Sequence, residues 1–288
     1  MVKKKDNSDQ TGVLYVVATP IGNLEDITYR AVRILGEVEL IVAEDTRHTR
    51  KLLSHFAINK PLISYYKDKE SARSDRIIDE LLQGRHVALV SDAGTPAISD
   101  PGAVLVSRCH ENSIPVVAVP GPSALTAALS VAGLRQPSFS FLGFLPSKKT
   151  QRIKILRSIA QEEKAVVFYE SPRRVAQTIA ECRDVMGEKK FFIARELTKI
   201  HEELLIGSTS EVLHQLKEKT AIKGEFIVTI FPNDAEKKEM PDDLEALLCW
   251  YRDQSQLSMK DSVKKISRDL NLSRSQVYEK ALHIWEKK

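Results

Sequence analysis

Long apolar runs are missing from this 288-residue sequence. A membrane-spanning helix needs about 20 consecutive apolar residues, and the longest candidate, residues 115–133, is interrupted by Pro120 and Pro122. The lysine triplet near the N-terminus is followed by acidic and polar residues, which is not the pattern of a secretory signal. We therefore expect a cytoplasmic protein without membrane contact.

Cysteines are few and carry no ligand spacing. Cys109, Cys182 and Cys249 are odd in number, far apart and free of any C-x-x-C pair. This argues against a disulfide framework or a structural zinc site and fits a reducing cytoplasm. His48 and His55 lie seven residues apart on one predicted helix, but no third ligand accompanies them. We expect no metal.

Neither sign of charge prevails. The 43 basic residues exceed the 39 acidic ones by a net charge of +4. Affinity for phosphate depends on where charge lies, so this total identifies no partner.

The first half alternates apolar runs with amphipathic segments. Strands are predicted over residues 13–18, 40–43, 62–66, 87–90 and 116–119. Helices are predicted over residues 26–35, 46–56, 71–82 and 100–111, capped by Asp26, Thr46, Ser71 and Asp100. This alternation predicts an open parallel sheet.

The second half has a different order of predicted strands and helices. Strands are predicted over residues 139–144, 165–169, 191–194, 203–206 and 225–231, with helices over 151–160, 173–186 and 210–219. No helix separates the third and fourth of these strands, which predicts a hairpin and a mixed sheet.

The C-terminal segment is predicted to be helical throughout. Residues 259–270 form an amphipathic helix, residues 271–273 a turn, and Ser273 or Ser275 caps a further helix. A helix-turn-helix fits this pattern, and so does a plain helical hairpin that closes the domain or a dimer. The predicted organisation is a disordered N-terminus (1–11), an α/β domain with a parallel sheet (12–134), an α/β domain with a mixed sheet (135–232) and a helical tail (240–288).

The loops after the strands are where we expect chemistry, because ligands of open parallel sheets bind beyond the carboxyl ends of the strands. Four such loops, residues 18–24, 44–48, 91–96 and 120–124, are rich in glycine, proline, small hydroxyls and carboxylates. Turn formation alone accounts for any one of them, and Glu44 and Asp45 also suit the positive end of a helix. Their convergence on one edge favours a binding site.

Phosphate-binding motifs are absent from these loops. The sequence contains no G-x-x-x-x-G-K-[ST], and no G-x-G-x-x-G follows the first strand. The pattern favours a nucleoside-like ligand without phosphates, held by backbone groups and an acid.

The second half adds charged groups at its own strand ends. Glu170 and the pair Arg195-Glu196 directly follow apolar strands, where a buried Glu–Arg pair without function is the alternative. Basic residues gather after the first strand and at the start of a helix; they are Lys148, Lys149, Arg152, Lys154, Arg157, Arg173 and Arg174. A solvated helix face and contacts to a phosphate backbone both explain this cluster.

Several motifs of the chain together resemble the ribosomal small subunit methyltransferase I family of the tetrapyrrole methylase superfamily. They are ATPIGNL (18–24), AEDTRH (43–48), SDAGTP (91–96), VPGPSA (119–124), FYESP (168–172), ARELTK (194–199) and Gly224-Glu225. SDAGTP together with AEDTRH is specific within the superfamily. The chain departs from the tetrapyrrole enzymes in a first loop with a single glycine, and from shorter family members in its helical tail.

The resemblance implies two α/β domains of tetrapyrrole-methylase type with S-adenosylmethionine in the cleft between them, and a homodimer. It implies methylation of the ribose 2'-oxygen of a cytidine in 16S rRNA of the 30S subunit. Carried over motif by motif, the cofactor contacts are Pro20, Asp92, Ala93, Ser123, Ala124, Phe168 or Tyr169, Ala194 and Gly224.

Transfer to a hydroxyl benefits from a positioned base, because a hydroxyl is a weak nucleophile at neutral pH. The candidates near the cleft are Asp45, Glu170, Glu196 and Lys199, which the sequence does not rank. Candidate RNA contacts are Arg47, His48, Lys148, Lys149, Arg152, Arg173, Arg174 and Arg195. Two other functions fit: a methylase of the same superfamily acting on a tetrapyrrole, another small molecule or a protein, and a non-catalytic RNA-binding module.

Overall fold

A computed structural model describes residues 11–66, 70–219, 221–232, 243–254, 257–270 and 272–286, without the side chains of residues 71, 72, 254 and 286. The chain separates into two compact units, Met1–Asn233 and Asp234–Lys288. Of the predicted N-terminal segment 1–11 only Thr11 is described, and the start of the predicted tail at 240–242 lies outside the described residues.

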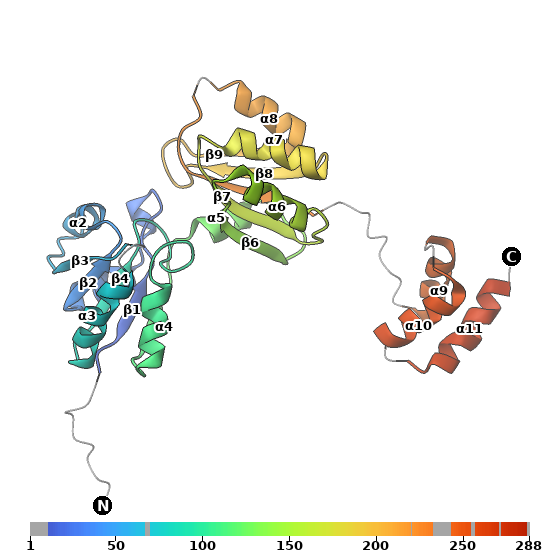
Figure 1. The fold of residues 1–288 in the computed structure, drawn as a ribbon, viewed down its shortest axis with the longest axis horizontal. Helices are drawn as coiled ribbons and strands as arrows, with labels where there is room; N and C mark the ends of the chain where they lie inside the picture. The colour runs from blue at the N-terminus through green and yellow to red at the C-terminus, as the bar shows by residue number, and fades with distance from the viewer. Residues whose placement is uncertain are drawn as a thin grey trace, which may run out of the picture. The chain divides into compact units, whose positions relative to one another are not determined.

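The first unit begins with a five-stranded parallel sheet of order β3-β2-β4-β1-β5 (Figure 1). Its strands are β1 (Leu14–Val17), β2 (Leu40–Ala43), β3 (Leu62–Ser64), β4 (Val87–Val90) and β5 (Val116–Val119). The helices between them are α1 (Tyr29–Glu37), α2 (Thr46–His55), α3 (Glu70–Leu82) and α4 (Ala103–Glu111), with a short 3-10 turn at Leu24–Asp26. The predicted parallel sheet is confirmed.

Both faces of this sheet are buried because helices pack on each of them, and successive side chains of each strand point to opposite faces. Leu14 and Leu89 pack with α3 and α4, whereas Val17 and Val90 pack with α1 and α2. Continuous apolar strands are therefore required here.

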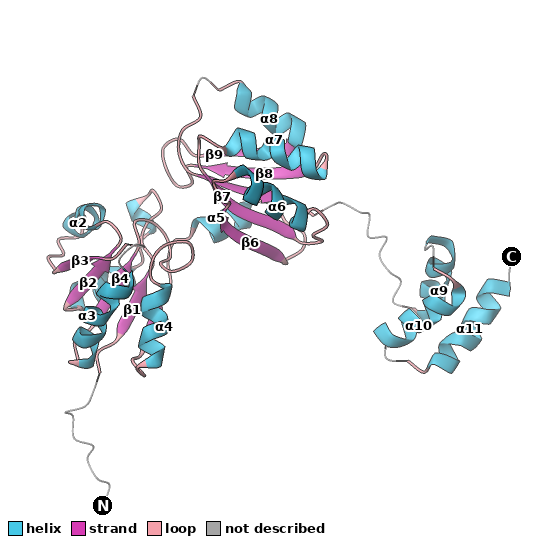
Figure 2. Ribbon diagram, in the orientation of Figure 1, coloured by secondary structure: helices cyan, strands magenta, loops and turns pink. Residues whose placement is uncertain are grey.

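The second sheet of the same unit is mixed, with the order β6-β7-β10-β8-β9 (Figure 2). Its strands are β6 (Phe139–Phe144), β7 (Ala165–Glu170), β8 (Lys190–Arg195), β9 (Glu203–Ser208) and β10 (Phe226–Ile230), and its helices are α6 (Lys149–Ile159), α7 (Val175–Met186) and α8 (Thr209–Lys217). β6 and β7 are parallel, and β8 and β9 form the predicted antiparallel hairpin.

One helix that packs on this second sheet was not predicted from the sequence. α5 (Ala124–Val131) follows β5 directly, and its Ala128 packs with Val167, Phe192 and Ile227 of the second sheet. α6, α7 and α8 cover the opposite face. α5 thus ties the exit of the first sheet to the apolar face of the second.

Helix starts also differ from the predictions. Thr28, not Asp26, caps α1, since its hydroxyl accepts from the Ala31 amide at 3.1 Å. Asp45, not Thr46, caps α2 through its contact with the Arg47 amide. α4 begins at Ala103, which leaves Asp100 in the preceding loop.

The second unit consists, over its described residues, of α9 (Leu244–Gln254), α10 (Met259–Asp269) and α11 (Arg274–Glu286). Leu248, Val263, Ile266 and Val277 form its buried core, and Ser258 caps α10. The unit therefore has a hydrophobic core of its own.

Candidate functional site

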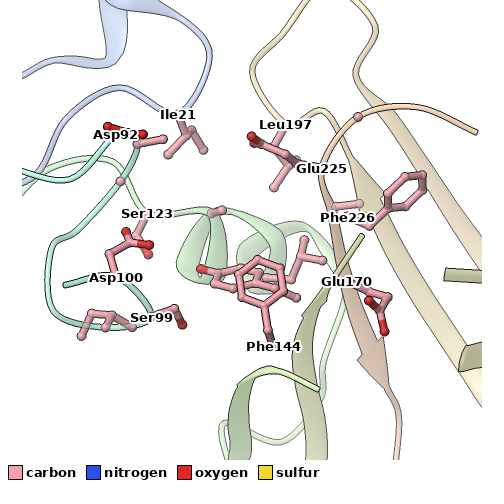
Figure 3. Close-up of a pocket in the computed structure, with 18 of the residues that line it drawn as sticks. Ile21, Asp92, Ser99, Asp100, Ser123, Phe144, Glu170, Leu197, Glu225 and Phe226 are labelled. Atoms are coloured by element: carbon pink, nitrogen blue, oxygen red, sulfur yellow. The ribbon is translucent and has the colours of Figure 1, made fainter. Parts of the chain in front are cut away.

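A cavity of about 410 Å³ lies where the carboxyl ends of the first sheet meet the second sheet (Figure 3). The first half contributes residues 21, 44, 92–95, 98–100, 123 and 124, and the second half residues 144, 169–172, 194, 197 and 224–227. All four strand exits singled out in the sequence reach it. Its volume falls within the roughly 300–1,000 Å³ of small-molecule sites.

Hydrogen bonds hold the first-sheet loops together. Thr19 and Gly94 exchange two backbone bonds of 2.9 Å, and the Asp45 amide donates to Oδ1 of Asp92 at 2.9 Å. The Thr95 hydroxyl donates to the Pro122 carbonyl at 3.3 Å. These bonds give the loops one fixed arrangement around the cavity.

Acidic side chains line the first-sheet wall. Burial, then the neighbouring Asp100 and Asp92, raise the pKa of Glu44. Burial raises the pKa of Asp100 too, with further effects from Asp92 and Glu225. Confined carboxylates of this kind favour a cationic ligand. A raised pKa also brings a carboxylate closer to the near-neutral pKa of an effective general base.

The opposite wall carries a tightly packed loop after β8. Glu196 and Thr198 adopt positive φ angles of 52° and 65°. Nζ of Lys199 donates to Oε1 of Glu196 at 2.8 Å and to Oε2 of Glu225 at 3.1 Å. Backbone strain of this kind persists only where the surroundings enforce it, as they do at binding sites.

Gly22, the single glycine of the first loop, allows this loop to contact the loop after β8. A Cβ at this position would lie 2.3 Å from Cγ of Lys199 and 2.9 Å from Oγ1 of Thr198. Only glycine lets the first loop approach the loop after β8 this closely. The two halves of the site meet at this contact, beside Ile21 and Leu197 of the cavity wall.

Most of the predicted cofactor contacts line the cavity. They are Asp92, Ala93, Ser123, Ala124, Tyr169, Ala194 and Gly224. Pro20 does not line it, although its neighbour Ile21 does. Phe168 is fully buried between the second sheet and its helices, because it points to the face of β7 opposite that of Tyr169. Of the two alternatives in that motif, only Tyr169 faces the cavity.

Two of the predicted bases are poorly suited to accept a proton. Hydrogen bonds from the Arg47 side chain and amide lower the pKa of Asp45 to about 2, and Asp45 does not line the cavity. Burial opposes the charge of Lys199, but Glu196 and Glu225 outweigh it and raise the pKa of Lys199, so the amine stays protonated. As general bases, both residues stay predictions.

The other two predicted bases are engaged within the protein. Burial opposes ionisation of Glu196, yet Lys199 and the Glu225 amide lower its pKa. Glu170 is 2% exposed; its carboxylate accepts from the Thr178 hydroxyl at 2.8 Å and forms an ion pair of 2.7 Å with Arg174. Both carboxylates position loops around the cavity.

The predicted RNA contacts divide by exposure. Arg47, His48, Lys148, Lys149 and Arg173 are exposed. Arg174 pairs with Glu170, and Arg195 donates to the Lys223 carbonyl at 2.7 Å and pairs with Glu203.

Arg152 is a clear correction among these residues. It is 2% exposed and binds both carboxylate oxygens of Glu181, at 2.6 and 2.9 Å. Its Nη1 also donates to the carbonyls of Pro146 and Ser147 at 3.0 Å. A guanidinium held in this way braces the loop after β6 and does not reach a phosphate.

Several residues of the cavity wall were not predicted from the sequence, notably Ile98, Ser99, Asp100 and Phe144. Asp100 was assigned to a helix cap, although its position a few residues beyond SDAGTP was a usable signal. Phe144 stands at the end of an apolar strand and gave none.

Two features are absent from the described part of the chain. No group of three His, Cys, Asp or Glu side chains among the described residues could hold a metal ion. Over the same residues, no helix has the length and apolar character needed to cross a membrane.

The fold and the cavity define a methylase of the tetrapyrrole type. The family model described as Tetrapyrrole (Corrin/Porphyrin) Methylases matches residues 13–213. Among solved structures, the uroporphyrin-III C-methyltransferase of Thermus thermophilus in complex with S-adenyl homocysteine superposes with a TM-score of 0.54 at 17% identity, over 76% of this chain and 97% of that one. The cobalt precorrin-4 methyltransferase CbiF gives 0.55 at 16% identity, over 75% and 94%.

Curated relatives narrow the family. A protein of Halalkalibacterium halodurans is 41% identical over 94% of both chains, and one of Synechocystis is 42% identical over 95% of this chain and 98% of its own. A protein of Thermotoga maritima is 46% identical over 76% of this chain and 98% of its own. All three are named ribosomal RNA small subunit methyltransferase I. The chain belongs to this family of tetrapyrrole methylases.

Proposed function

We propose that this protein transfers a methyl group from S-adenosylmethionine to the ribose 2'-oxygen of a cytidine in 16S rRNA. The observation that carries the proposal is the acid-lined cavity at the carboxyl ends of the first sheet, in a chain that shares 41–47% identity with the ribosomal methyltransferases. We further propose that the protein acts in the cytoplasm on the 30S subunit and that it is a homodimer. We also propose the domain boundaries that were inferred from the sequence.

The residues of the cavity fit this cofactor. Its cationic sulfonium and amino groups suit the carboxylates of Glu44 and Asp92, while the apolar walls at Ile21 and Leu197 suit the adenosine. Gly224, at φ +97°, lets this part of the cavity wall pack closely against Glu196, because a Cβ there would lie 2.4 Å from Cγ of Glu196. A confined site that combines carboxylates with apolar walls matches a nucleoside-like ligand that carries positive charge.

When bound, the cofactor supplies an electrophilic methyl group on a sulfonium, so the protein's share of the work is positioning and proton removal. The loops fixed around Thr19, Asp92 and Thr95 hold the donor's pocket in one geometry. Asp100 is our candidate for the group that accepts the hydroxyl proton, because it lines the cavity and has a raised pKa.

The RNA is held, in this proposal, by exposed cations near the site. Lys148 and Lys149 follow the cavity residue Phe144 by a few positions, and Arg173 follows the cavity residue Pro172. Arg47 and His48 lie on α2 beside the loop that carries Glu44. Cations in these places would contact phosphates and fix the register of the substrate.

Labelled S-adenosylmethionine incubated with 30S subunits that lack the modification tests the proposal. We expect label in 16S rRNA, at the 2'-oxygen of one cytidine after nuclease digestion, and cofactor binding by calorimetry. Cofactor binding without label in RNA would favour a small-molecule or protein substrate. RNA binding without cofactor binding would indicate a non-catalytic module.

A further inference from the structure

Phe144 is an exposed aromatic side chain inside the cavity. It lines the cavity at the end of β6, yet 59% of its surface is exposed. Figure 3 shows its ring in the open space between the loop of Ser99 and Asp100 and the end of β7 at Glu170. Ile98 of that facing loop also lines the cavity and is 56% exposed. Two large apolar groups therefore remain open to a ligand at one part of the site.

The backbone directs Phe144 to this position. β6 pairs with β7 in register up to Phe141 opposite Val167, and then shifts so that Phe144 lies opposite Tyr169. An irregularity of this kind re-aims side chains and is common next to functional sites. Gly143, at φ +61°, makes the turn, and a Cβ there would lie 3.3 Å from Oγ of Ser99.

Neighbouring rings hold Phe144 by contact on one side. Its centroid lies 5.3 Å from that of Tyr169 with the planes tilted by 51°, and Phe141 packs edge-on against Tyr169 at 5.1 Å. The ring is thus backed by an aromatic cluster while more than half of its surface is free. This is the geometry of a stacking platform.

The surroundings favour a nucleotide of a chain over a free small molecule. The loop that continues from Phe144 ends at the exposed Lys148, next to the exposed Lys149 at the start of α6, and Arg152 fixes that loop through the carbonyls of Pro146 and Ser147. Unpaired bases of RNA stack on aromatic side chains while cations hold the flanking phosphates. An aromatic ring followed by anchored lysines combines both functions in one segment.

We propose that Phe144 is the stacking platform for the target nucleobase, with Ile98 facing it across the cavity. The proposal rests on the RNA methylation proposed above and adds the subsite that receives the base. Base stacking on an aromatic residue corresponds to about a 10- to 100-fold effect on binding. Phe144 contacts substrate in this role but takes no part in proton transfer.

The test compares Phe144→Ala, Phe144→Leu and Phe144→Trp with Phe139→Ala. Phe139 lies on the same strand, is 41% exposed and does not line the cavity, so it is a matched control. Three quantities are measured for each folded variant: Kd for S-adenosylmethionine by calorimetry, Kd for 30S subunits, and KM and kcat for methylation.

We expect Phe144→Ala and Phe144→Leu to raise the 30S Kd and KM about 10- to 100-fold, with the cofactor Kd within twofold of wild type. Phe144→Trp should restore RNA binding, and Phe139→Ala should match wild type. Leucine keeps the apolar volume, so its loss of RNA binding isolates the aromatic ring. A parallel loss of cofactor affinity would overturn the proposal in favour of stacking on the cofactor, and an unchanged 30S Kd and KM would also overturn it. Wild-type protein that methylates no RNA would refute the proposed function itself, before any variant is compared.

Discussion

At the scale of single residues, folding destabilises the charge of carboxylates in the cavity wall and stabilises the charge of a carboxylate outside it. Burial raises the pKa of Glu44 and of Asp100. Outside the cavity, hydrogen bonds from the Ser208 amide and hydroxyl lower the pKa of Glu211 in the capping box of α8. Carboxylates of the first kind reduce stability at neutral pH, which is typical of groups placed for function.

Glu44→Gln should therefore stabilise the protein at neutral pH. Because the folded state raises the pKa of Glu44, it holds the proton more tightly than the unfolded chain does. Stability is thus highest below the unfolded pKa, about 4.3, and falls as pH rises through the folded value. Glutamine removes this loss, so the Tm of the variant should exceed that of wild type at pH 7.5, and the difference should shrink towards pH 4. Thermal unfolding followed across this range measures it.

Glu211→Gln is the control with the opposite sign. Its lowered pKa stabilises the fold above the unfolded value, so the variant should have a lower Tm at pH 7.5 and approach wild type on acidification. If both substitutions changed the Tm at pH 7.5 in the same direction, the conclusion that folding disfavours the charge of Glu44 would be wrong.

Asp100→Asn should slow methylation about 100-fold in single-turnover experiments, the lower end of the range for loss of a general base. Asparagine keeps the size of the side chain, so cofactor affinity should change far less than the rate. In wild type the rate should rise with pH through the raised pKa of Asp100, and that limb should vanish in the variant.

Asp45→Asn is the comparison for this rate. Its pKa is near 2, and it caps α2 outside the cavity wall, so its single-turnover rate should stay within threefold of wild type. A larger loss in Asp45→Asn than in Asp100→Asn would reverse the assignment of the base.

At the scale of helices and strands, periodicity predicted nearly every element of the two sheets, although the predicted capping residues of α1, α2 and α4 were wrong. Continuous apolar runs such as Val87–Val90 identified the parallel strands, because those strands are buried on both faces. α5 was missed because its residues are small or apolar on all sides, so it has no amphipathic pattern. Its burial depends on the second sheet, a tertiary contact that local sequence does not contain.

The site was predictable to the same extent. Strand exits led to the loops of Asp92 and Ser123 because parallel strands place their carboxyl ends at one edge, whereas Gly224 was found only through the family resemblance. The depth of Arg152 and the aim of Phe144 were not predictable, since one depends on a partner 29 positions away and the other on an irregular pairing of β6.

The pairing of α6 and α7 through Arg152 and Glu181 gives a prediction about stability. Arg152→Met leaves the Glu181 carboxylate buried without its ion pair, which costs about 3–5 kcal/mol of the free energy of unfolding. Chemical denaturation should show this loss. The double variant with Glu181→Leu should recover most of it, since no unpaired charge then remains buried.

Lys149→Met is the control on the same helix. Lys149 is exposed, so the substitution should leave the free energy of unfolding within about 0.5 kcal/mol of wild type while it weakens binding to 30S subunits. If Arg152→Met were as stable as Lys149→Met, the bracing role of Arg152 would be wrong.

At the scale of the whole molecule, the chain combines a catalytic unit with a second, helical unit. The unit Asp234–Lys288 packs around its own core of Leu248, Val263 and Val277. The Thermotoga relative aligns over 98% of its own length with only 76% of this chain, so the family fold does not require the remainder. The helical unit is therefore an addition whose function is separable from the fold of the methylase.

Removal of residues 234–288 should leave cofactor binding and the folding of the first unit intact, because the two sheets and the cavity lie entirely within Met1–Asn233. The exposed cations of α10 and α11, among them Lys260, Lys264 and Arg274, suit binding to phosphates. We therefore expect the truncated protein to bind 30S subunits more weakly and with a shallower dependence of log Kd on log salt concentration, by about 0.7–0.9 for each phosphate that the protein no longer neutralises. The variant Lys260→Met/Lys264→Met/Arg274→Met in the full chain should reproduce part of this change. A truncation that alters the oligomeric state in ultracentrifugation but keeps the salt dependence would assign the helices to the dimer interface instead.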